Sequence, residues 1–272
     1  MRPMTASGTQ AAPLSALERL DSIFSAIAGR PLGLFLDYDG TLTPIVERPQ
    51  LAELAESMRG TLRALAARAT VAVISGRDLP DLERRVAVEG ICYAGSHGFD
   101  IAAPRGARAA PPLPLATLLE LDAAERMLRR SLGAIDGALV ERKRFSIAAH
   151  YRQVHPERVP AVHAAVDRTL GAHPSLRKMP GKMVCELLPD IAWDKGAALR
   201  WLLQALGLGS ESAAIYIGDD ETDEDAFRAL GTHGIGIAVQ ERPRATAASY
   251  VLRNTDEVEL LLGRLATLIP PR

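Results

Sequence analysis

The sequence has few cysteines, no long apolar run and almost no net charge, and each absence excludes a class of protein. Its 272 residues include only Cys92 and Cys185, so we expect a reducing, cytoplasmic location and no disulfide framework, although one bridge between them stays open. No apolar run reaches the length of a membrane span. The formal net charge of −1 argues against general attraction to nucleic acid or anionic membranes.

The N-terminal residues lack the apolar stretch of a signal peptide. Residues 1–14 are small and polar, so we expect a disordered leader there. Ser15, with Glu18 three residues later, is typical of a capping box. We therefore predict an amphipathic helix that begins at Ser15 and ends at Gly29.

Short apolar runs alternate with turns and helical stretches, which favours a parallel, doubly wound sheet. Strands are expected at 32–36, 70–74, 91–94 and 213–217, with helices at 51–68 and 195–206 among them. Residues 102–114 are rich in Pro, Ala and Arg and indicate a linker and domain boundary. After them, two helices and three or four strands predict a small α+β domain.

These patterns predict an α/β fold: a doubly wound, mainly parallel, Rossmann-like core sheet with an inserted small α+β cap domain. The expected division is a leader at 1–14, a core formed by 15–105 and 188–272, and a cap at 106–187. Residues 115–186 contain 12 Lys and Arg against 8 Asp and Glu, whereas the remainder is net acidic. A basic module that faces an acidic one suits an anionic substrate held between them.

The first candidate site follows the expected strand at 32–36, where Asp37 and Asp39 precede Gly40. Two carboxylates that point the same way repel each other unless a cation or a shared proton intervenes. The end of a parallel strand is also where open α/β sheets bind ligands. An ordinary Asp-Gly turn explains this stretch equally well.

The second candidate site follows the expected strand at 213–217, where six of the seven residues from Asp219 to Asp225 are acidic. Acids in the first turn of a helix account for Asp223 and its neighbours. Asp219 and Asp220 are less well explained in that way, because they lie at the strand end. A hard dication such as Mg²⁺ would relieve their repulsion, and both acidic sites could share one ion.

Two further positions suit an anion. Ser75 and Gly76 follow the expected strand at 70–74, where a hydroxyl and free N–H groups at a helix start can bind a phosphate. Lys195 opens a helix, where a cation needs an anionic partner. A plain N-cap for Ser75, and either Asp194 or solvent for Lys195, are the alternatives.

In this order, the motifs DYDGT, SGR, DKG and GDDETDEDAF resemble the haloacid dehalogenase superfamily of aspartate-nucleophile phosphatases. Within it the chain resembles the trehalose-6-phosphate phosphatase family, through DYDGTLTPI, GSHG (95–98), VERKRFSIAAHYR (140–152) and GKMVCELLP (181–189). The resemblance covers nearly the whole chain after residue 15. It implies a phosphatase with an aspartyl-phosphate intermediate, Mg²⁺ as cofactor and a sugar phosphate as substrate.

The resemblance also implies residue roles in the core. Asp37 would be the nucleophile, and Asp39 the general acid and then the general base. Mg²⁺ would be held by Asp37, the backbone carbonyl of Asp39, and Asp219. The auxiliary acids would be Asp220 and Asp223. The residues that bind the phosphoryl group would be Ser75, Gly76 and Lys195.

In the cap, the resemblance implies a set of charged residues that hydrogen-bond trehalose hydroxyls. They are Glu141, Lys143, Arg152, Lys182 and Glu186, with His97 lining the core side of the cleft. Cross-strand salt bridges are the alternative explanation for these charges.

Two other functions stay open on the sequence. One is a related phosphatase for sucrose phosphate or mannosylglycerate phosphate, and the other is a catalytically silent regulatory module. The presence of both Asp37 and Asp39 argues against the silent module. We expect a monomer or weak oligomer with no nucleic-acid or membrane partner.

Overall fold

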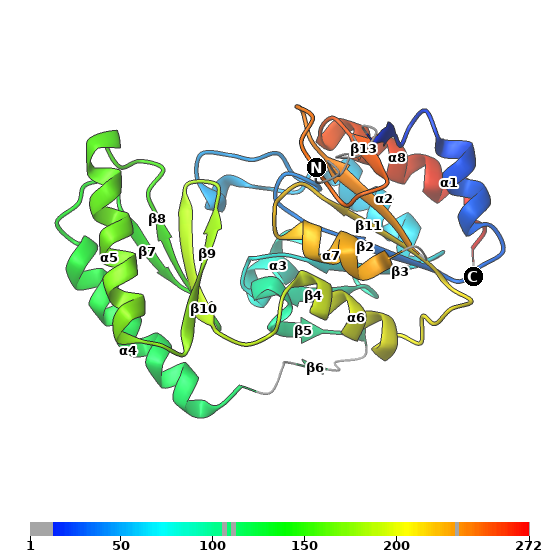
Figure 1. Ribbon diagram of the computed structural model, residues 1–272. Coiled ribbons are helices and arrows are strands. Elements are labelled where there is room, and N and C mark those ends of the chain that lie inside the picture. The colour runs from blue at the N-terminus through cyan, green and yellow to red at the C-terminus, as the bar shows by residue number, and fades with distance from the viewer. Residues whose placement is uncertain (1–12, 105–107, 110–112, 232–233, 272) are drawn as a thin grey trace, which may run out of the picture.

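The computed structural model describes residues 13–104, 108–109, 113–231 and 234–271. Figure 1 shows two lobes side by side, a larger core at the right and a smaller cap at the left. The leader expected at 1–14 falls almost entirely outside the described residues. Among the described helices, none combines the length and apolar character needed to cross a membrane.

The core is built on a sheet that has nine strands within the described residues, in the order β1-β13-β12-β11-β2-β3-β4-β5-β6. Pairing is parallel from β1 to β4 and antiparallel from β4 to β6. The mainly parallel sheet expected from the sequence is therefore confirmed. The strands are β1 (Leu14–Ser15), β2 (Leu32–Leu36), β3 (Thr70–Ile74), β4 (Cys92–Gly95), β5 (Asp100–Ala102), β6 (Arg108–Ala109), β11 (Ala213–Gly218), β12 (Gly234–Val239) and β13 (Tyr250–Leu252).

Helices cover both faces of this sheet because its central strands are apolar on both sides. In β2, Leu34 and Leu36 pack into one apolar cluster and Phe35 into the other. The first cluster includes residues of α1 (Leu20–Ile27), α2 (Glu56–Ala66), α3 (Leu79–Val86) and α8 (Thr255–Leu268). The second includes residues of α6 (Lys195–Ala205) and α7 (Asp223–Leu230).

The cap has an antiparallel sheet with four strands in the described residues, in the order β7-β8-β10-β9. Alternation along the strands sends Cys185 and Leu187 into an apolar cluster with the cap helices, whereas Glu186 lines a cleft beside the core. The elements are α4 (Leu115–Leu132), β7 (Leu139–Arg142), β8 (Ile147–His150), α5 (Val159–Ala172), β9 (Leu176–Gly181) and β10 (Val184–Pro189).

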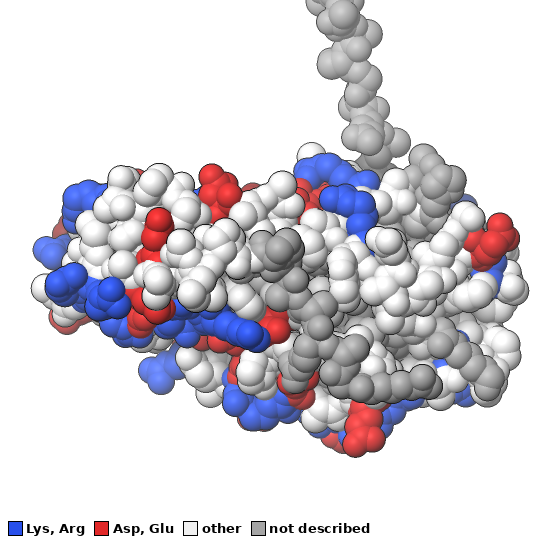
Figure 2. Space-filling model, turned by 90° about the horizontal axis from the view of Figure 1, so that it is seen from below, with Lys and Arg blue, Asp and Glu red and all other residues white. Residues whose placement is uncertain are grey.

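The cap also touches the core through side chains. Phe145 of the cap stacks on Phe99 of the core with ring centroids 6.1 Å apart, and Arg144 Nη1 lies 2.8 Å from Asp100 Oδ2. On the face in Figure 2, acidic and basic side chains are intermixed, so neither lobe presents a broad surface of one charge there. The predicted boundary at 105/106 falls in residues outside those described, and it stays a prediction.

Three expectations for local structure are wrong. Ser15 is not a helix cap, because β1 pairs with β13 more than 230 residues away, and α1 begins at Leu20. The helix expected from 51 begins at Glu56, after a 3₁₀ turn at Pro49–Leu51. The stretch expected as a linker at 102–114 contributes the end of β5 and all of β6 to the core sheet.

Candidate active site

The central strand β2 brings the two acidic stretches together. Asp37 follows β2, Asp219 follows β11 and Ser75 follows β3, and β2 lies between β11 and β3. These positions are the carboxyl ends of adjacent parallel strands, and β3 and β11 lie on opposite sides of β2. Sequence segments nearly 200 residues apart thus meet at one edge of the sheet.

Three buried carboxylates form a cluster at this edge. Oxygen atoms of Asp37, Asp219 and Asp223 all lie within 4.8 Å of one another, and the side chains are almost inaccessible to solvent. Burial, opposed by the charge of Lys195, raises the pKa of Asp37 well above its ordinary value, and Asp223 and Asp219 raise it further. The sequence predicted repulsion within each acidic stretch and one ion shared by both, whereas the repulsion on Asp37 comes from the carboxylates of the other stretch.

Lys195 is the buried cation of the cluster. Its Nζ lies 2.7 Å from Asp37 Oδ1 and 2.6 Å from Asp223 Oδ1, and Tyr216 donates to the same Asp223 oxygen at 2.7 Å. The anionic partner that a lysine at a helix start needs is therefore supplied by these two carboxylates. Lys182 also pairs with Asp219, so two lysines face the three carboxylates, and the cluster stays short of positive charge among the described residues.

The cluster fits a divalent cation with oxygen ligands. Asp219 Oδ1 is buried and accepts no hydrogen bond from the described residues, so one oxygen is free to coordinate. The backbone of Gly40, with φ +86°, approaches so closely that a Cβ there would lie 2.2 Å from Asp219 Oδ2. Burial raises the pKa of Asp219 to about 6, against the opposing effect of Lys182. Three crowded carboxylates are the donor set that Mg²⁺ prefers.

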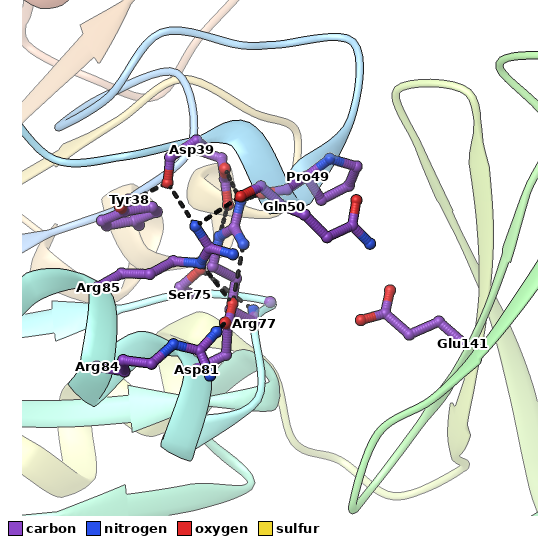
Figure 3. Close-up of polar contacts among 12 residues, drawn as sticks. Tyr38, Asp39, Pro49, Gln50, Ser75, Arg77, Asp81, Arg84, Arg85 and Glu141 are labelled. Atoms are coloured by element: carbon purple, nitrogen blue, oxygen red, sulfur yellow. Dashed lines mark hydrogen bonds and ion pairs between the residues drawn. The ribbon is translucent and has the colours of Figure 1, made fainter.

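The Asp39 carboxylate lies apart from this cluster and pairs with Arg77. Arg77 Nε lies 2.7 Å from Asp39 Oδ2, and Nη2 lies 2.6 Å from Asp39 Oδ1 (Figure 3). Asp39 keeps 34% of its side chain exposed and lines the cleft, whereas Arg77 is 9% exposed. Asp37 and Asp39 therefore have different environments although they are two residues apart.

A second buried network joins cap and core. Glu186 Oε1 accepts from Lys143 Nζ at 2.7 Å, and Glu186 Oε2 lies 2.9 Å from His97 Nε2. Burial disfavours the charge on Glu186, but Lys143 and His97 outweigh it and hold the pKa of that carboxyl well below its ordinary value. Lys143 also donates to the Gly76 carbonyl at 2.8 Å, which ties the cap to the turn that follows β3.

The other predicted cap residues lie around the same opening. Glu141 Oε2 lies 2.7 Å from His150 Nε2, and Arg152 donates to the Lys182 carbonyl at 3.1 Å. Lys182, between β9 and β10, reaches the core and pairs with Asp219. The Glu141–His150 pair is cross-strand, as the alternative explanation expected, whereas the Lys182–Asp219 pair joins the cap to the core.

One cleft of about 740 Å³ between the lobes brings the predicted residues together. Asp223 is buried beneath it and does not line it. The predicted residues that line it are Asp37, Asp39, Ser75, Gly76, His97, Glu141, Lys143, Arg152, Lys182, Glu186, Lys195, Asp219 and Asp220.

Sequence reasoning assigned no role to three residues that shape the site. Arg77 follows the predicted phosphate-binding turn and binds Asp39, His150 binds Glu141, and Tyr216 binds Asp223. Arg77 belongs to the SGR motif, which is a signal that could have identified it. His150 likewise belongs to the VERKRFSIAAHYR motif, whereas Tyr216 is part of an apolar strand sequence and carries no comparable signal.

A family model and named relatives support one family. A family model described as trehalose-phosphatase matches residues 35–256. The trehalose-phosphate phosphatase of Mycobacterium marinum is 44% identical over 251 residues, which is 88% of this chain and 64% of that protein. The chain thus spans less than two thirds of the length of this relative.

Solved structures show the same fold. The C-terminal domain of C. albicans trehalose-6-phosphate phosphatase matches 96% of this chain and all of that chain, with a TM-score of 0.79 at 22% identity. Aspergillus fumigatus trehalose-6-phosphate phosphatase is 27% identical with a TM-score of 0.64, and the match covers 94% of this chain and 99% of that one. Because the family model covers most of the sequence, including both acidic stretches, the chain belongs to the trehalose-phosphatase family.

Proposed function

We propose that this protein is a Mg²⁺-dependent phosphatase that hydrolyses trehalose 6-phosphate to trehalose and phosphate through an aspartyl-phosphate intermediate. The observation that carries the proposal is that Asp37 and Asp219 of the carboxylate cluster line the same cleft as the polar cap residues. Family membership and the name of the M. marinum relative support the substrate class.

In the first step, an Asp37 oxygen attacks phosphorus and the bond from phosphorus to the sugar oxygen breaks. Asp39 gives its proton to that sugar oxygen, which leaves as a hydroxyl. Lys195, which contacts Asp37 Oδ1, fixes the orientation of the nucleophile and offsets negative charge beside it. Ser75 and the Gly76 backbone bind the transferring phosphoryl group.

In the second step, a water molecule attacks phosphorus of the aspartyl phosphate. Asp39 takes a proton from this water, and Asp37 is released as a carboxylate with inorganic phosphate. Asp37, Asp219 and either Asp223 or the Asp39 carbonyl would hold the Mg²⁺ ion, which would supply positive charge that offsets the charge of the phosphoryl group. Asp220 is an auxiliary acid beside this site.

The cap residues select the sugar. Trehalose presents many hydroxyl groups and little apolar area, so charged donors and acceptors suit it. Lys143 and Glu186 are fixed by their mutual hydrogen bond, and His97 lies beside them on the core side. The remaining members of this set are Glu141, Arg152 and Lys182.

The test is phosphate release from a panel of esters with Mg²⁺: trehalose 6-phosphate, sucrose 6-phosphate, mannosylglycerate phosphate and glucose 6-phosphate. We expect the highest kcat/KM for trehalose 6-phosphate and no turnover by the Asp37→Asn protein. Equal or better turnover of another ester would overturn the assignment of trehalose 6-phosphate as the substrate. An inactive wild type would favour a catalytically silent module. An active Asp37→Asn protein would show that Asp37 is not the nucleophile.

A further inference from the structure

The loop between β12 and β13 contacts the second acidic stretch. β12 pairs with β11 in parallel, so its carboxyl end lies at the same edge of the sheet as Asp219. From this loop, Arg244 Nη2 donates to the backbone carbonyl of Asp219, and the Ala247 N–H donates to Glu224 Oε2 at 2.7 Å. The loop is therefore joined to the acidic stretch at two points.

The peptide group between Asp219 and Asp220 is held at both ends. Its carbonyl accepts from Arg244, and its N–H donates to Asp223 Oδ2 at 2.9 Å. The other oxygen of Asp223 is held by the Lys195 ammonium group at 2.6 Å. Because a residue has only two soft backbone torsions, a peptide plane fixed on both sides sets the ψ torsion of Asp219. The direction in which the Asp219 side chain leaves the backbone is set with it.

Arg244 binds the backbone of Asp219 and not its carboxylate. It is partly buried, its Nε atom is buried without a partner, and it pairs with no carboxylate among the described residues. An arginine that only balanced the charge of the acidic stretch would be expected to pair with one of the acids there. The contact fixes Asp219 and leaves its Oδ1 atom, which accepts no hydrogen bond from the described residues, free to coordinate.

We propose that Arg244 is a positioning residue for the metal site: by holding the Asp219 carbonyl, it directs the Asp219 carboxylate toward the place where Mg²⁺ would bind. This inference rests on the proposed function, because it concerns the metal ion of the same site. Arg244 is not among the residues that line the cleft, so it touches neither the substrate nor the reacting atoms. Groups that orient a metal ligand typically contribute 10- to 100-fold to metal affinity.

Two competing explanations predict different changes in Mg²⁺ affinity. If Arg244 acts only through its charge, its removal should tighten Mg²⁺ binding, because a guanidinium group repels a dication. If it only fastens the loop, its removal should lower the free energy of unfolding without metal and leave Mg²⁺ affinity unchanged. The positioning role alone predicts weaker Mg²⁺ binding.

The experiment is isothermal titration calorimetry with Mg²⁺ alone, in the absence of substrate. We expect the Kd for Mg²⁺ to rise roughly 10-fold in the Arg244→Met protein. Arg242→Met is the matched control, because Arg242 is an exposed residue of the same loop, and its Kd should stay within about 2-fold of the wild type. Lys182→Met, which removes a cation from the Asp219 carboxylate itself, should change the Kd in the opposite direction.

Unchanged or tighter Mg²⁺ binding by the Arg244→Met protein would overturn the inference, while phosphate release by the wild type upheld the proposed function. A wild type that does not bind Mg²⁺ would overturn the inference together with the metal dependence in the proposed function. Should Arg244→Met fail to fold, Arg244→Lys serves for the same comparison. It keeps the charge on a side chain of different shape, so the positioning role predicts a smaller loss of affinity, and an unchanged Kd would overturn the inference.

Discussion

Lys182 of the cap pairs with Asp219 of the core, so a residue expected to bind the sugar contacts a candidate metal ligand. The Asp219 carboxylate is 6% exposed, whereas the Lys182 side chain is 47% exposed and lies between β9 and β10. The contact links the two lobes directly across the cleft. It also places a cation beside the oxygen atoms that Mg²⁺ would need.

Replacing Lys182 with Met should raise the affinity for Mg²⁺ and weaken sugar binding. The ammonium group repels a dication and occupies one Asp219 oxygen, so its loss should tighten Mg²⁺ binding by about 2- to 5-fold, the range of an exposed ion pair. KM for trehalose 6-phosphate should rise. Isothermal titration calorimetry measures the first effect and steady-state kinetics the second, and weaker Mg²⁺ binding would contradict the account.

Replacing Gly40 with Ala should destabilise the protein and disrupt the metal site. Gly40 has φ +86°, and a Cβ would lie 2.2 Å from Asp219 Oδ2, so the backbone or Asp219 must move. We expect a loss of about 1–3 kcal/mol in the free energy of unfolding, measured by urea denaturation, and loss of the stabilisation that Mg²⁺ provides. Gly60→Ala is the control, because Gly60 lies inside α2 with open space around it, and it should stabilise by about 0.5–1 kcal/mol. Unchanged stability in the Gly40→Ala protein would be evidence against the close approach of the Gly40 backbone to the Asp219 carboxylate.

Replacing Glu186 with Gln should lower stability at neutral pH and matter less in acid. The folded-state pKa of Glu186 lies well below its ordinary value of 4.5, because Lys143 and His97 overcome the effect of burial. The ionised Glu186 carboxylate therefore contributes fully to the free energy of unfolding above about pH 4.5, and this contribution is lost as pH falls below that value.

At pH 7 we expect Glu186→Gln to cost about 3 kcal/mol, because Lys143 loses its buried partner. Urea midpoints of the two proteins at pH 7 and pH 3 give the comparison. A difference that is the same at both pH values would show that the ionised carboxylate is not what stabilises the network. Glu56→Gln is a control, since its ion pairs with Arg59 and Arg63 lie at the exposed start of α2.

The parts of the site predicted from the sequence are those encoded locally. Asp37 and Asp219 each follow an apolar strand, and parallel strands place such ends at one edge of the sheet. The strands expected after residue 114 are likewise present as the cap sheet, in which β7 and β10 carry Glu141 and Glu186. Patterns of period two and short motifs carry this information without any knowledge of distant contacts.

The parts that were missed depend on distant partners. Ser15 and Glu18 satisfy the capping-box pattern, but pairing of β1 with β13 outweighs it, because strand pairing satisfies several backbone groups at once. The bidentate ion pair between Arg77 and Asp39 joins residues 38 apart in the sequence, and nothing near Asp39 in the sequence indicates it. Similarly, Asp223 was expected as an auxiliary acid, and only the fold shows its oxygen within the Asp37 and Asp219 cluster.

The most direct test of the account is to trap the phosphoryl group on Asp37. With Asp39→Asn, which has lost the base for the second step, p-nitrophenyl phosphate should still phosphorylate Asp37, and the product should accumulate. Acid quenching followed by peptide mass spectrometry should then find one phosphoryl group on Asp37, and none in the Asp37→Asn protein. Phosphate release by the wild type without any phosphoryl group on Asp37 in either background would contradict the account.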